Sequence, residues 1–167
     1  KDGYILFLGR LVPEKRVELL IEAFKNLKTE KQLVIAGGVS DSGEYAEQLK
    51  ELSKDDIRII FTGFVEGQLL GELYSNSYIY VLPSDLEGMP LSLLEAMSYG
   101  NCCLTSNIAE CKTVTADHGL TFEKGNLQDL AEKLQMLCDN PQTVENYKNK
   151  SAEYILNKYN WDDVTNK

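Results

Sequence analysis

The sequence predicts an α/β fold, a Rossmann-like parallel sheet with helices on both faces. Short apolar runs of four or five residues alternate with longer segments whose apolar residues recur every three or four positions. Runs that are apolar throughout are typical of strands in a parallel sheet. The right-handed crossover helices cover both faces of such a sheet and bury the side chains on each. No repeat, linker or low-complexity segment divides the 167 residues, so we expect one domain.

The first half of the chain supplies three strands and three helices to this prediction. Tyr4–Leu8 is apolar and is followed by Gly9, which indicates a buried strand. After a loop over Gly9–Lys15, helical spacing of apolar residues runs from Val17 to Leu27. The next predicted elements are a strand at Gln32–Ala36, a loop at Val39–Gly43, a helix at Tyr45–Ser53, a strand at Ile57–Phe61 and a helix at Gly67–Ser75.

The second half continues the alternation. Tyr78–Leu82 is the fourth predicted strand and Pro90–Tyr99 the helix after it, since proline lacks an N–H that the first helical turn leaves unused. The remaining predicted elements are a strand at Cys102–Thr105, a loop at Ser106–Thr113, a short strand near Gly119–Phe122, a helix lined by Leu127, Leu130, Leu134 and Leu137, and a helix from Pro141 to about Lys158.

The loops that follow the strands carry the residues of chemical interest. Ligands of open α/β sheets bind beyond the carboxyl ends of the strands. Four positions come just after predicted strands, so we expect them to meet at one edge of the sheet. They are Gly9, Phe64, Glu87 and Ser106.

The composition restricts the class of protein. Hydrophobic residues make up 43% and charged residues 26%, as in ordinary globular domains. No apolar run approaches the length of about 18 residues that would span a membrane. The formal net charge of −9 argues against nucleic acid or an anionic membrane as the main partner. A phosphate ligand would therefore need a local group of cations.

The cysteines and the single histidine do not form a metal-site pattern. Cys102, Cys103, Cys111 and Cys138 lack the C-x-x-C spacing, and His118 is the one imidazole. Because the cysteines lie among apolar neighbours, we expect buried free thiols in a reducing compartment. We take His118 as structural.

The segment Ser84–Gly100 is the most informative stretch. It reads S-D-L-E-G-M-P-L-S-L-L-E-A-M-S-Y-G, with Glu87 before the predicted helix and Glu95 inside it. The first turn of a helix favours an anion such as phosphate, and Gly88 allows a ligand to approach the backbone. Carboxylates accept paired hydrogen bonds from vicinal hydroxyls. The segment therefore predicts a sugar joined to a diphosphate, or a ribose, as the ligand.

Four motifs in the expected order resemble the group 1 (family 4) retaining glycosyltransferases of the GT-B fold. The Ser84–Gly100 segment is similar to their E-x7-E signature. Gly9–Lys15 resembles their G-R-L-x-P-x-K-G loop, and Phe61–Val65 their F-x-G-x-V turn. Trp161 stands where the family often has a tryptophan near the end. The resemblance implies the C-terminal, donor-binding half of such an enzyme.

The resemblance implies catalytic roles for Arg10, Lys15 and Glu87. The family's equivalents of the two cations clamp the donor diphosphate and stabilise its charge as it leaves. Glu87 would contact the transferred sugar, and Glu95 the ribose hydroxyls. Because the chain has no Asp-x-Asp motif, the implied transfer needs no metal and no other cofactor. Arg16 stands where the family often has glycine.

The same resemblance implies the substrate-binding positions. The turn after the third strand would lie beside the nucleobase, and the loop before the signature helix would offer backbone groups to phosphate or sugar. In that loop Met89-Pro90 replaces the family's frequent Phe-Gly. The expected substrate-binding residues are Gly9, Gly63, Phe64, Val65, Gly88, Met89, Pro90, Leu91 and Glu95.

The implied function is that of a hexosyltransferase-type glycosyltransferase in polysaccharide biosynthesis. The domain would bind a UDP- or GDP-sugar for transfer to an acceptor with retained configuration. Two alternatives stay open, a nucleotide-sugar epimerase of GT-B architecture and a non-catalytic nucleotide-binding or interaction module.

The resemblance further implies a partner domain. The sequence begins without methionine and enters a strand almost at once, so we expect a fragment, inactive alone, whose N-terminal acceptor domain is absent. Residues 1–167 would form a single nucleotide-sugar-binding domain. The expected partners are the nucleotide diphosphate sugar and the missing domain, without nucleic acid and without membrane contact from this domain. We expect a cytoplasmic enzyme, at most peripheral at the inner face of a membrane.

Overall fold

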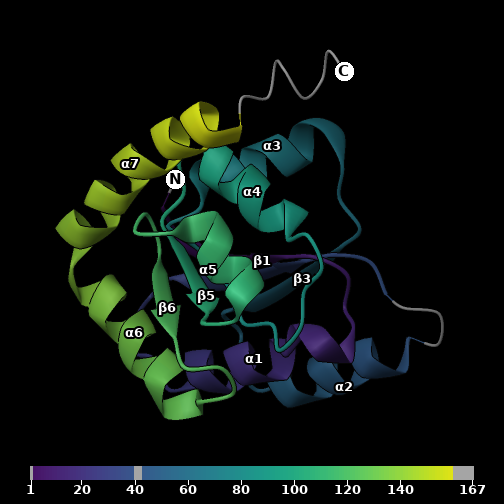
Figure 1. Ribbon diagram of the computed structural model, residues 1–167. Coiled ribbons are helices and arrows are strands. Elements are labelled where there is room, and N and C mark those ends of the chain that lie inside the picture. The colour runs from purple at the N-terminus through teal and green to yellow at the C-terminus, as the bar shows by residue number, and fades with distance from the viewer. Residues whose placement is uncertain (1, 40–42, 160–167) are drawn as a thin grey trace.

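The centre of the molecule is a six-stranded parallel sheet in the order β3-β2-β1-β4-β5-β6 (Figure 1). The structure is a computed structural model that describes residues 2–39 and 43–159. At the middle of the sheet, Leu6 lies opposite Val34 on one side and Tyr80 on the other. The strands are β1 (Tyr4–Leu8), β2 (Gln32–Ala36), β3 (Ile59–Gly63), β4 (Ile79–Leu82), β5 (Cys103–Ser106) and β6 (Leu120–Phe122).

Helices cover both faces of the sheet, as the sequence predicts. Helices α1, α2 and α6 lie on one face and α3, α4 and α7 on the other, while α5 lies beside the ends of β5 and β6 (Figure 1). The helices are α1 (Val17–Lys25), α2 (Glu44–Ser53), α3 (Gly67–Asn76), α4 (Leu91–Ser98), α5 (Ala109–Thr115), α6 (Leu127–Asp139) and α7 (Pro141–Tyr159), with a short 3-10 helix η1 (Pro13–Lys15).

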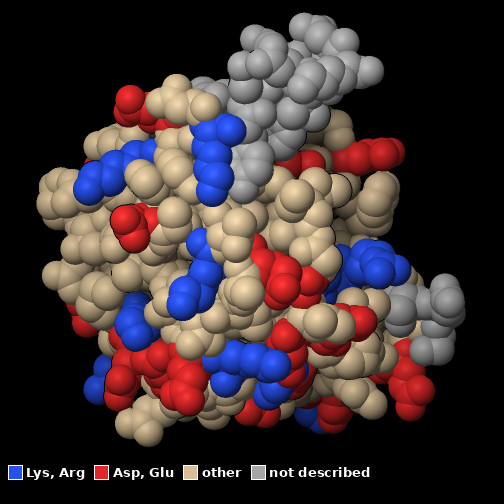
Figure 2. Space-filling model, viewed as in Figure 1, with Lys and Arg blue, Asp and Glu red and all other residues tan. Residues whose placement is uncertain are grey.

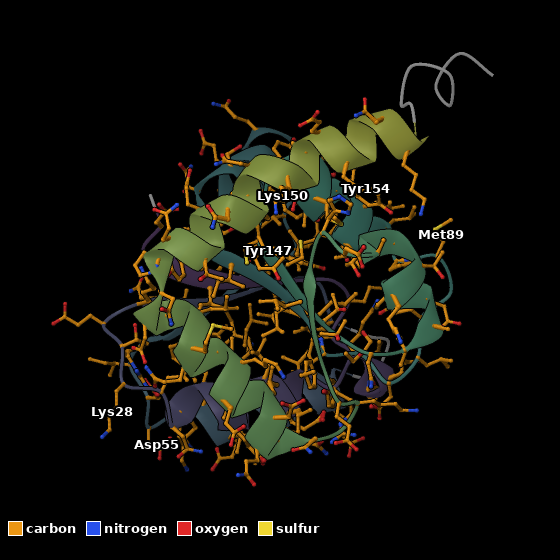
Figure 3. The ribbon with its side chains drawn as sticks, turned by 60° about the vertical axis from the view of Figure 1, so that its left-hand side comes forward. Lys28, Asp55, Met89, Tyr147, Lys150 and Tyr154 are labelled. Atoms are coloured by element: carbon orange, nitrogen blue, oxygen red, sulfur yellow. The ribbon has the colours of Figure 1, made fainter. Side chains whose placement is uncertain are left out.

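Burial explains why these residues form these elements. The residues of β4 and β5 are all buried, and α1 buries six of its nine residues against the sheet. The last helix, α7, returns across the sheet to pack on α4. Tyr147 and Tyr154 of α7 pack against the core from the side that faces the sheet (Figure 3). The sheet and its two helix layers therefore share one core.

Two predicted elements are wrong in detail. The third strand begins two residues later than expected, at Ile59, because Asp56 and Arg58 form a turn in which the Asp56 carboxylate accepts the Arg58 N–H. Ile57 is apolar but lies 95% exposed in that turn. The predicted loop Ser106–Thr113 contains most of α5, whose buried side is formed by Cys111, Val114 and Thr115.

Smaller differences concern the helix of the glutamate signature and the cysteines. Helix α4 begins at Leu91, with Pro90 as its N-cap rather than its first residue. Cys102, Cys103 and Cys111 are buried free thiols as expected, whereas Cys138 is partly exposed. Trp161, the tryptophan of the family resemblance, lies outside the described residues.

Candidate functional site

The order of the strands identifies one crevice in the sheet. β1 and β4 are neighbours, but the chain continues from β1 toward β2 and β3, and from β4 toward β5 and β6. The loops after two such strands diverge, which leaves a crevice at the carboxyl edge where α/β proteins bind nucleotides. Here the two loops are Gly9–Arg16 after β1 and Pro83–Pro90 after β4.

A buried ion pair joins these two loops. Lys15 Nζ lies 2.8 Å from Glu87 Oε2, and the Ser84 hydroxyl donates to the same oxygen at 2.6 Å. The side chains of Lys15 and Glu87 are 18% and 5% exposed. Without these donors the Glu87 carboxylate would be a buried, uncompensated charge. Removal of one partner of a buried ion pair typically lowers the free energy of unfolding by about 3 to 5 kcal/mol. The structure thus brings together two residues for which the family resemblance implies catalytic roles.

Further bonds connect the neighbouring loops. The Asp85 N–H donates to the Glu14 carbonyl at 2.9 Å, and Arg16 Nη1 lies 2.9 Å from Asp85 Oδ2. The Ser106 hydroxyl, at the end of β5, donates to the Ser84 carbonyl. The loops after β1, β4 and β5 are therefore held side by side around the ion pair.

Close backbone packing brings the glycines to the same edge. The Gly9 N–H donates to the Ala36 carbonyl at 3.0 Å, and the Gly37 N–H to the Gly63 carbonyl at 2.9 Å. A Cβ on Gly37 would lie 1.7 Å from the Gly9 carbonyl oxygen, so only glycine fits there. Gly9 and Gly63 therefore lie at one edge of the sheet, Gly9 after β1 as predicted and Gly63 at the end of β3.

The turn after β3 presents an aromatic ring. Phe64 is 72% exposed, and its Cβ would lie 3.7 Å from a Cβ on Gly38 in the loop after β2. Val65 instead packs against the core. An exposed ring beside a glycine offers a flat apolar surface of the kind on which a planar base stacks.

The loop before α4 is only partly available to a ligand. Gly88 and Met89 are exposed, and Met89 projects away from the body of the molecule (Figure 3). The Leu91 N–H donates to the Met89 carbonyl at 2.9 Å, so this N–H has an acceptor within the loop itself. A cavity of about 410 Å³ lies between this loop and α5. Its lining residues are Gly88, Met89, Pro90, Ala109, Glu110, Thr113 and Val114.

Glu95 lies apart from the buried ion pair. It is exposed on α4 and lines a cavity of about 370 Å³ with Leu70, Ser98 and Tyr99. Burial, with the charge of Glu95 as a second cause, raises the pKa of Tyr74 well above its ordinary value. An exposed carboxylate with a phenol beside it is free to accept hydrogen bonds from hydroxyl groups of a ligand.

Arg10 is the most accessible of the predicted catalytic residues. It is exposed on the loop after β1, and within residues 2–39 and 43–159 its side chain has no ion pair or hydrogen bond. Lys15 is compensated by Glu87, so Arg10 is the cation of this loop that an anion meets without displacing a carboxylate.

The structure adds residues to the site that the sequence reasoning missed. Ser84, Asp85 and Arg16 hold the loops together, and α5 forms one wall of the cavity beside Met89. The spacing of Cys111, Val114 and Thr115 was the available signal for α5. Burial raises the pKa of the Cys111 thiol to about 12, so it stays protonated at neutral pH and is a poor nucleophile.

The described part of the chain offers neither a cluster of metal ligands nor a membrane-spanning helix. No group of three or more His, Cys, Asp or Glu among these residues is arranged to hold a metal ion. No described helix is both long and apolar enough to cross a membrane. Figure 2 shows acidic and basic side chains interspersed on one face of the molecule.

Comparisons with known proteins agree with this fold. The family model for glycosyl transferases group 1 matches residues 1–154. The O-antigen chain mannosyltransferase B of Escherichia coli is 31% identical over 143 residues, which cover 83% of this chain and 38% of that protein. The catalytic domain of cholesterol-α-glucosyltransferase from Helicobacter pylori superposes with a TM-score of 0.78 at 25% identity, over 94% of this chain and 99% of that one.

A likeness of fold extends to more distant structures. Anabaena HepE, solved with UDP and glucose, superposes with a TM-score of 0.87 at 16% identity, over 94% of this chain and 44% of that one. The molecule is thus a Rossmann-like domain of GT-B type with its crevice between β1 and β4. The chain belongs to the group 1 glycosyltransferases. It spans less than half the length of the curated relatives that it matches.

Proposed function

We propose that this domain binds the donor of a glycosyl transfer, a nucleoside diphosphate sugar with uridine or guanosine as its base. The observation that carries the proposal is the Lys15–Glu87 pair, which bridges the loops on the two sides of the β1–β4 crevice. A cation next to a carboxylate suits a ligand with a diphosphate at one end and a sugar hydroxyl at the other. HepE, which shares the fold, was solved with UDP and glucose.

In this proposal each predicted residue meets one part of the donor. Arg10 and Lys15 bind the diphosphate, Glu87 faces the sugar, and Glu95 accepts the ribose hydroxyls. Phe64 and Val65 border the base, while Gly9 and Gly63 let the backbone come close to the ligand. The loop from Gly88 to Leu91 lies along the sugar.

The proposed reaction is a retaining transfer of a hexose without a metal ion. The bond between the anomeric carbon and the phosphate oxygen breaks with its electron pair on the diphosphate, and an acceptor hydroxyl oxygen bonds to the same face of that carbon. The hydroxyl proton passes to the departing phosphate oxygen. Arg10 and Lys15 stabilise the negative charge that develops. Glu87 is engaged by Lys15 and Ser84, which supports an electrostatic rather than a nucleophilic role.

The proposal includes a second domain and a place for the reaction. The acceptor would bind to a domain outside this chain, in a cytoplasmic enzyme of polysaccharide biosynthesis that is at most peripheral to a membrane. The donor sugar would enter the crevice from the edge where that domain lies.

Calorimetric titration of the chain with UDP, GDP and ADP tests the proposal. We expect one of UDP and GDP to bind equally with EDTA and with magnesium. Arg10→Ala and Lys15→Ala should each raise its Kd by about ten-fold or more, since hydrogen bonds to charged groups contribute roughly 1.5 to 3 kcal/mol. Lys50→Ala, at an exposed lysine of α2, is the matched control and should leave the Kd unchanged.

Three results would count against the proposal. Absence of binding by all three nucleotides would contradict a donor site in this domain. Binding that requires magnesium would contradict the metal-free part. Binding that survives both Arg10→Ala and Lys15→Ala would place the nucleotide elsewhere.

A further inference from the structure

Arg16 has a backbone conformation that arginine rarely adopts. Its φ of 54° and ψ of 42° lie in the left-handed region, between the end of η1 and the start of α1. Glycine and asparagine are the residues that usually occupy this region, and other residues are found there where surrounding structure requires them. Arginine at this position therefore carries a conformational cost that glycine would not.

The guanidinium group crosses from the loop after β1 to the loop after β4. Nη1 lies 2.9 Å from Asp85 Oδ2, and Nε lies 3.2 Å from Glu18 Oε2. The hydrogen bond with Asp85 is the largest cause of a raised pKa for Arg16. Asp85 Oδ1 is buried and has no hydrogen-bond partner within the described residues, so Arg16 is the cation that compensates this carboxylate.

The same two segments meet at three successive points. The Glu14 carbonyl accepts the Asp85 N–H, Lys15 pairs with Glu87, and Arg16 pairs with Asp85. Glu14 and Arg16, on either side of Lys15, therefore both hold Asp85, next to the ion pair of the proposed site. A shift of the loop at Asp85 would also move Glu87, which lies two residues further along the chain.

We infer that Arg16 is a positioning residue, which fixes the distance between Lys15 and Glu87 by holding Asp85. The inference rests on the proposed function, since it concerns the donor site itself. Arg16 does not need to touch the donor for this role. Direct contact of Arg16 with the diphosphate is the competing explanation, and the experiment separates the two.

The first test compares Arg16→Gly, Arg16→Asn and Arg16→Lys with the unchanged chain. Nucleotide Kd and thermal unfolding are measured for each, with UDP and GDP as probes. Glycine and asparagine suit the left-handed conformation, which offsets part of the stability lost with the Arg16–Asp85 ion pair, so the Tm should fall only slightly. The Kd should nevertheless rise by about five-fold for both, and by less for lysine, which keeps the charge.

The control is an ion pair of α1 far along the helix from this site. Lys25 Nζ lies 3.0 Å from Asp55 Oδ1, and Lys25 is exposed to a similar extent as Arg16. Lys25→Ala should leave the nucleotide Kd unchanged. A Kd for Arg16→Gly equal to that of the unchanged chain would overturn the inference.

A double-mutant cycle with Asp85→Asn separates positioning from direct contact. If Arg16 acts through Asp85, Asp85→Asn alone raises the Kd by a similar factor, and Arg16→Gly in addition changes it little further. If Arg16 contacts the diphosphate directly, Asp85→Asn leaves the Kd unchanged or lowers it. The second result would overturn the inference.

Hydrogen exchange measured without nucleotide tests the positioning role of Arg16 independently of the proposed function. Arg16→Gly should speed exchange of the amides in the loop after β4, residues 84–89, while Lys25→Ala should not. Absence of nucleotide binding by the unchanged chain, together with faster exchange in Arg16→Gly, would contradict the proposed function alone. Unchanged exchange in Arg16→Gly would overturn the positioning role.

Discussion

Gly37 sets the closest backbone approach in the site, because a Cβ there would lie 1.7 Å from the Gly9 carbonyl oxygen. Gly37→Ala should therefore force the strand ends of β1 and β2 apart and lower the free energy of unfolding by about 3 kcal/mol. Urea unfolding measures the change. Gly38→Ala is the matched control, since its Cβ would meet Phe64 at an ordinary 3.7 Å. A similar loss in both variants would show that the Gly9 contact is not the cause.

The proposed contact between Glu95 and the ribose hydroxyls of the nucleotide can be tested by substitution. Glu95→Gln should raise the Kd for the preferred nucleoside diphosphate by about ten-fold, because a carboxylate accepts stronger hydrogen bonds from hydroxyl groups than an amide does. Its effect on the 2′,3′-dideoxy analogue should be small, since that analogue lacks the hydroxyls. Titration calorimetry with both ligands measures the difference. An equal loss of affinity for the two ligands would show that Glu95 does not bind the ribose hydroxyls.

The sequence predicted single residues of the site unequally well. Glu87 and Gly9 could be placed at the carboxyl edge because each follows a strand, and strand ends converge in a parallel sheet. The Arg16–Asp85 pair could not be predicted, because it joins residues far apart in the chain and no local period marks it. The bond from the Leu91 N–H to the Met89 carbonyl could not be predicted either, because it depends on the path of the loop.

At the scale of elements, Arg58 links the turn before β3 to the end of α1. Its Nη1 donates to the Leu27 and Thr29 carbonyls, and its Nε and Nη2 pair with the Asp56 carboxylate. The hydrogen bond from Arg58 is the first cause that holds the pKa of Asp56 below its ordinary 3.8. A depressed carboxylate pKa stabilises the folded state above the unfolded pKa, and this stabilisation is lost as the pH falls through the folded pKa.

Asp56→Asn should therefore lower the free energy of unfolding by about 1 to 2 kcal/mol at pH 7. The difference from the unchanged chain should shrink as the pH falls below 3.8 and vanish below the folded pKa of Asp56. Urea unfolding at a series of pH values measures it. Asp117→Asn, at an exposed carboxylate, is the control and should show little difference at any pH. If the difference in free energy of unfolding between Asp56→Asn and the unchanged chain persisted below the folded pKa of Asp56, ionisation of Asp56 would not be its cause.

The elements themselves were predictable where burial and period agree. β1, β2 and β4 are buried runs, and their predicted bounds match the structure to within a residue. β3 is an edge strand of mixed exposure, so apolar Ile57 extended the predicted strand into a turn. Helix α5 is only seven residues long, too short for its period to stand out from a loop.

At the scale of the whole molecule, several exposed apolar residues lie in segments that follow strands, as the proposed site does. Val39, Phe64, Met89 and Leu91 are large apolar residues more than half exposed, and all belong to segments that follow strands. Together with the exposed cation Arg10, they give the carboxyl edge apolar surface and an accessible positive charge within a chain of net charge −9. Such an edge suits a ligand that is partly planar and partly anionic.

The proposed division of labour between this domain and a second one leads to a prediction about turnover. The chain covers 43% of one curated relative and 38% of another, and the proposed site holds contacts for a donor but none assigned to an acceptor. The chain alone should therefore bind its nucleotide yet show negligible transfer. Donor binding should raise the free energy of unfolding by about 2.7 kcal/mol at 100 times Kd, since a ligand that binds only the folded state stabilises it by mass action.

Thermal unfolding at increasing nucleotide concentration and an assay for released nucleotide check the two halves of this prediction. A Tm that rises with nucleotide concentration, with nucleotide release from the donor no faster than in Lys15→Ala, would support a domain that binds the donor but needs a second domain for transfer. Sugar transfer by the chain alone, lost in Lys15→Ala and kept in Lys50→Ala, would show that the acceptor also binds here. The carboxyl edge of the sheet would then have to hold both substrates, and the cavity between Met89 and α5 would be the first place to seek the second.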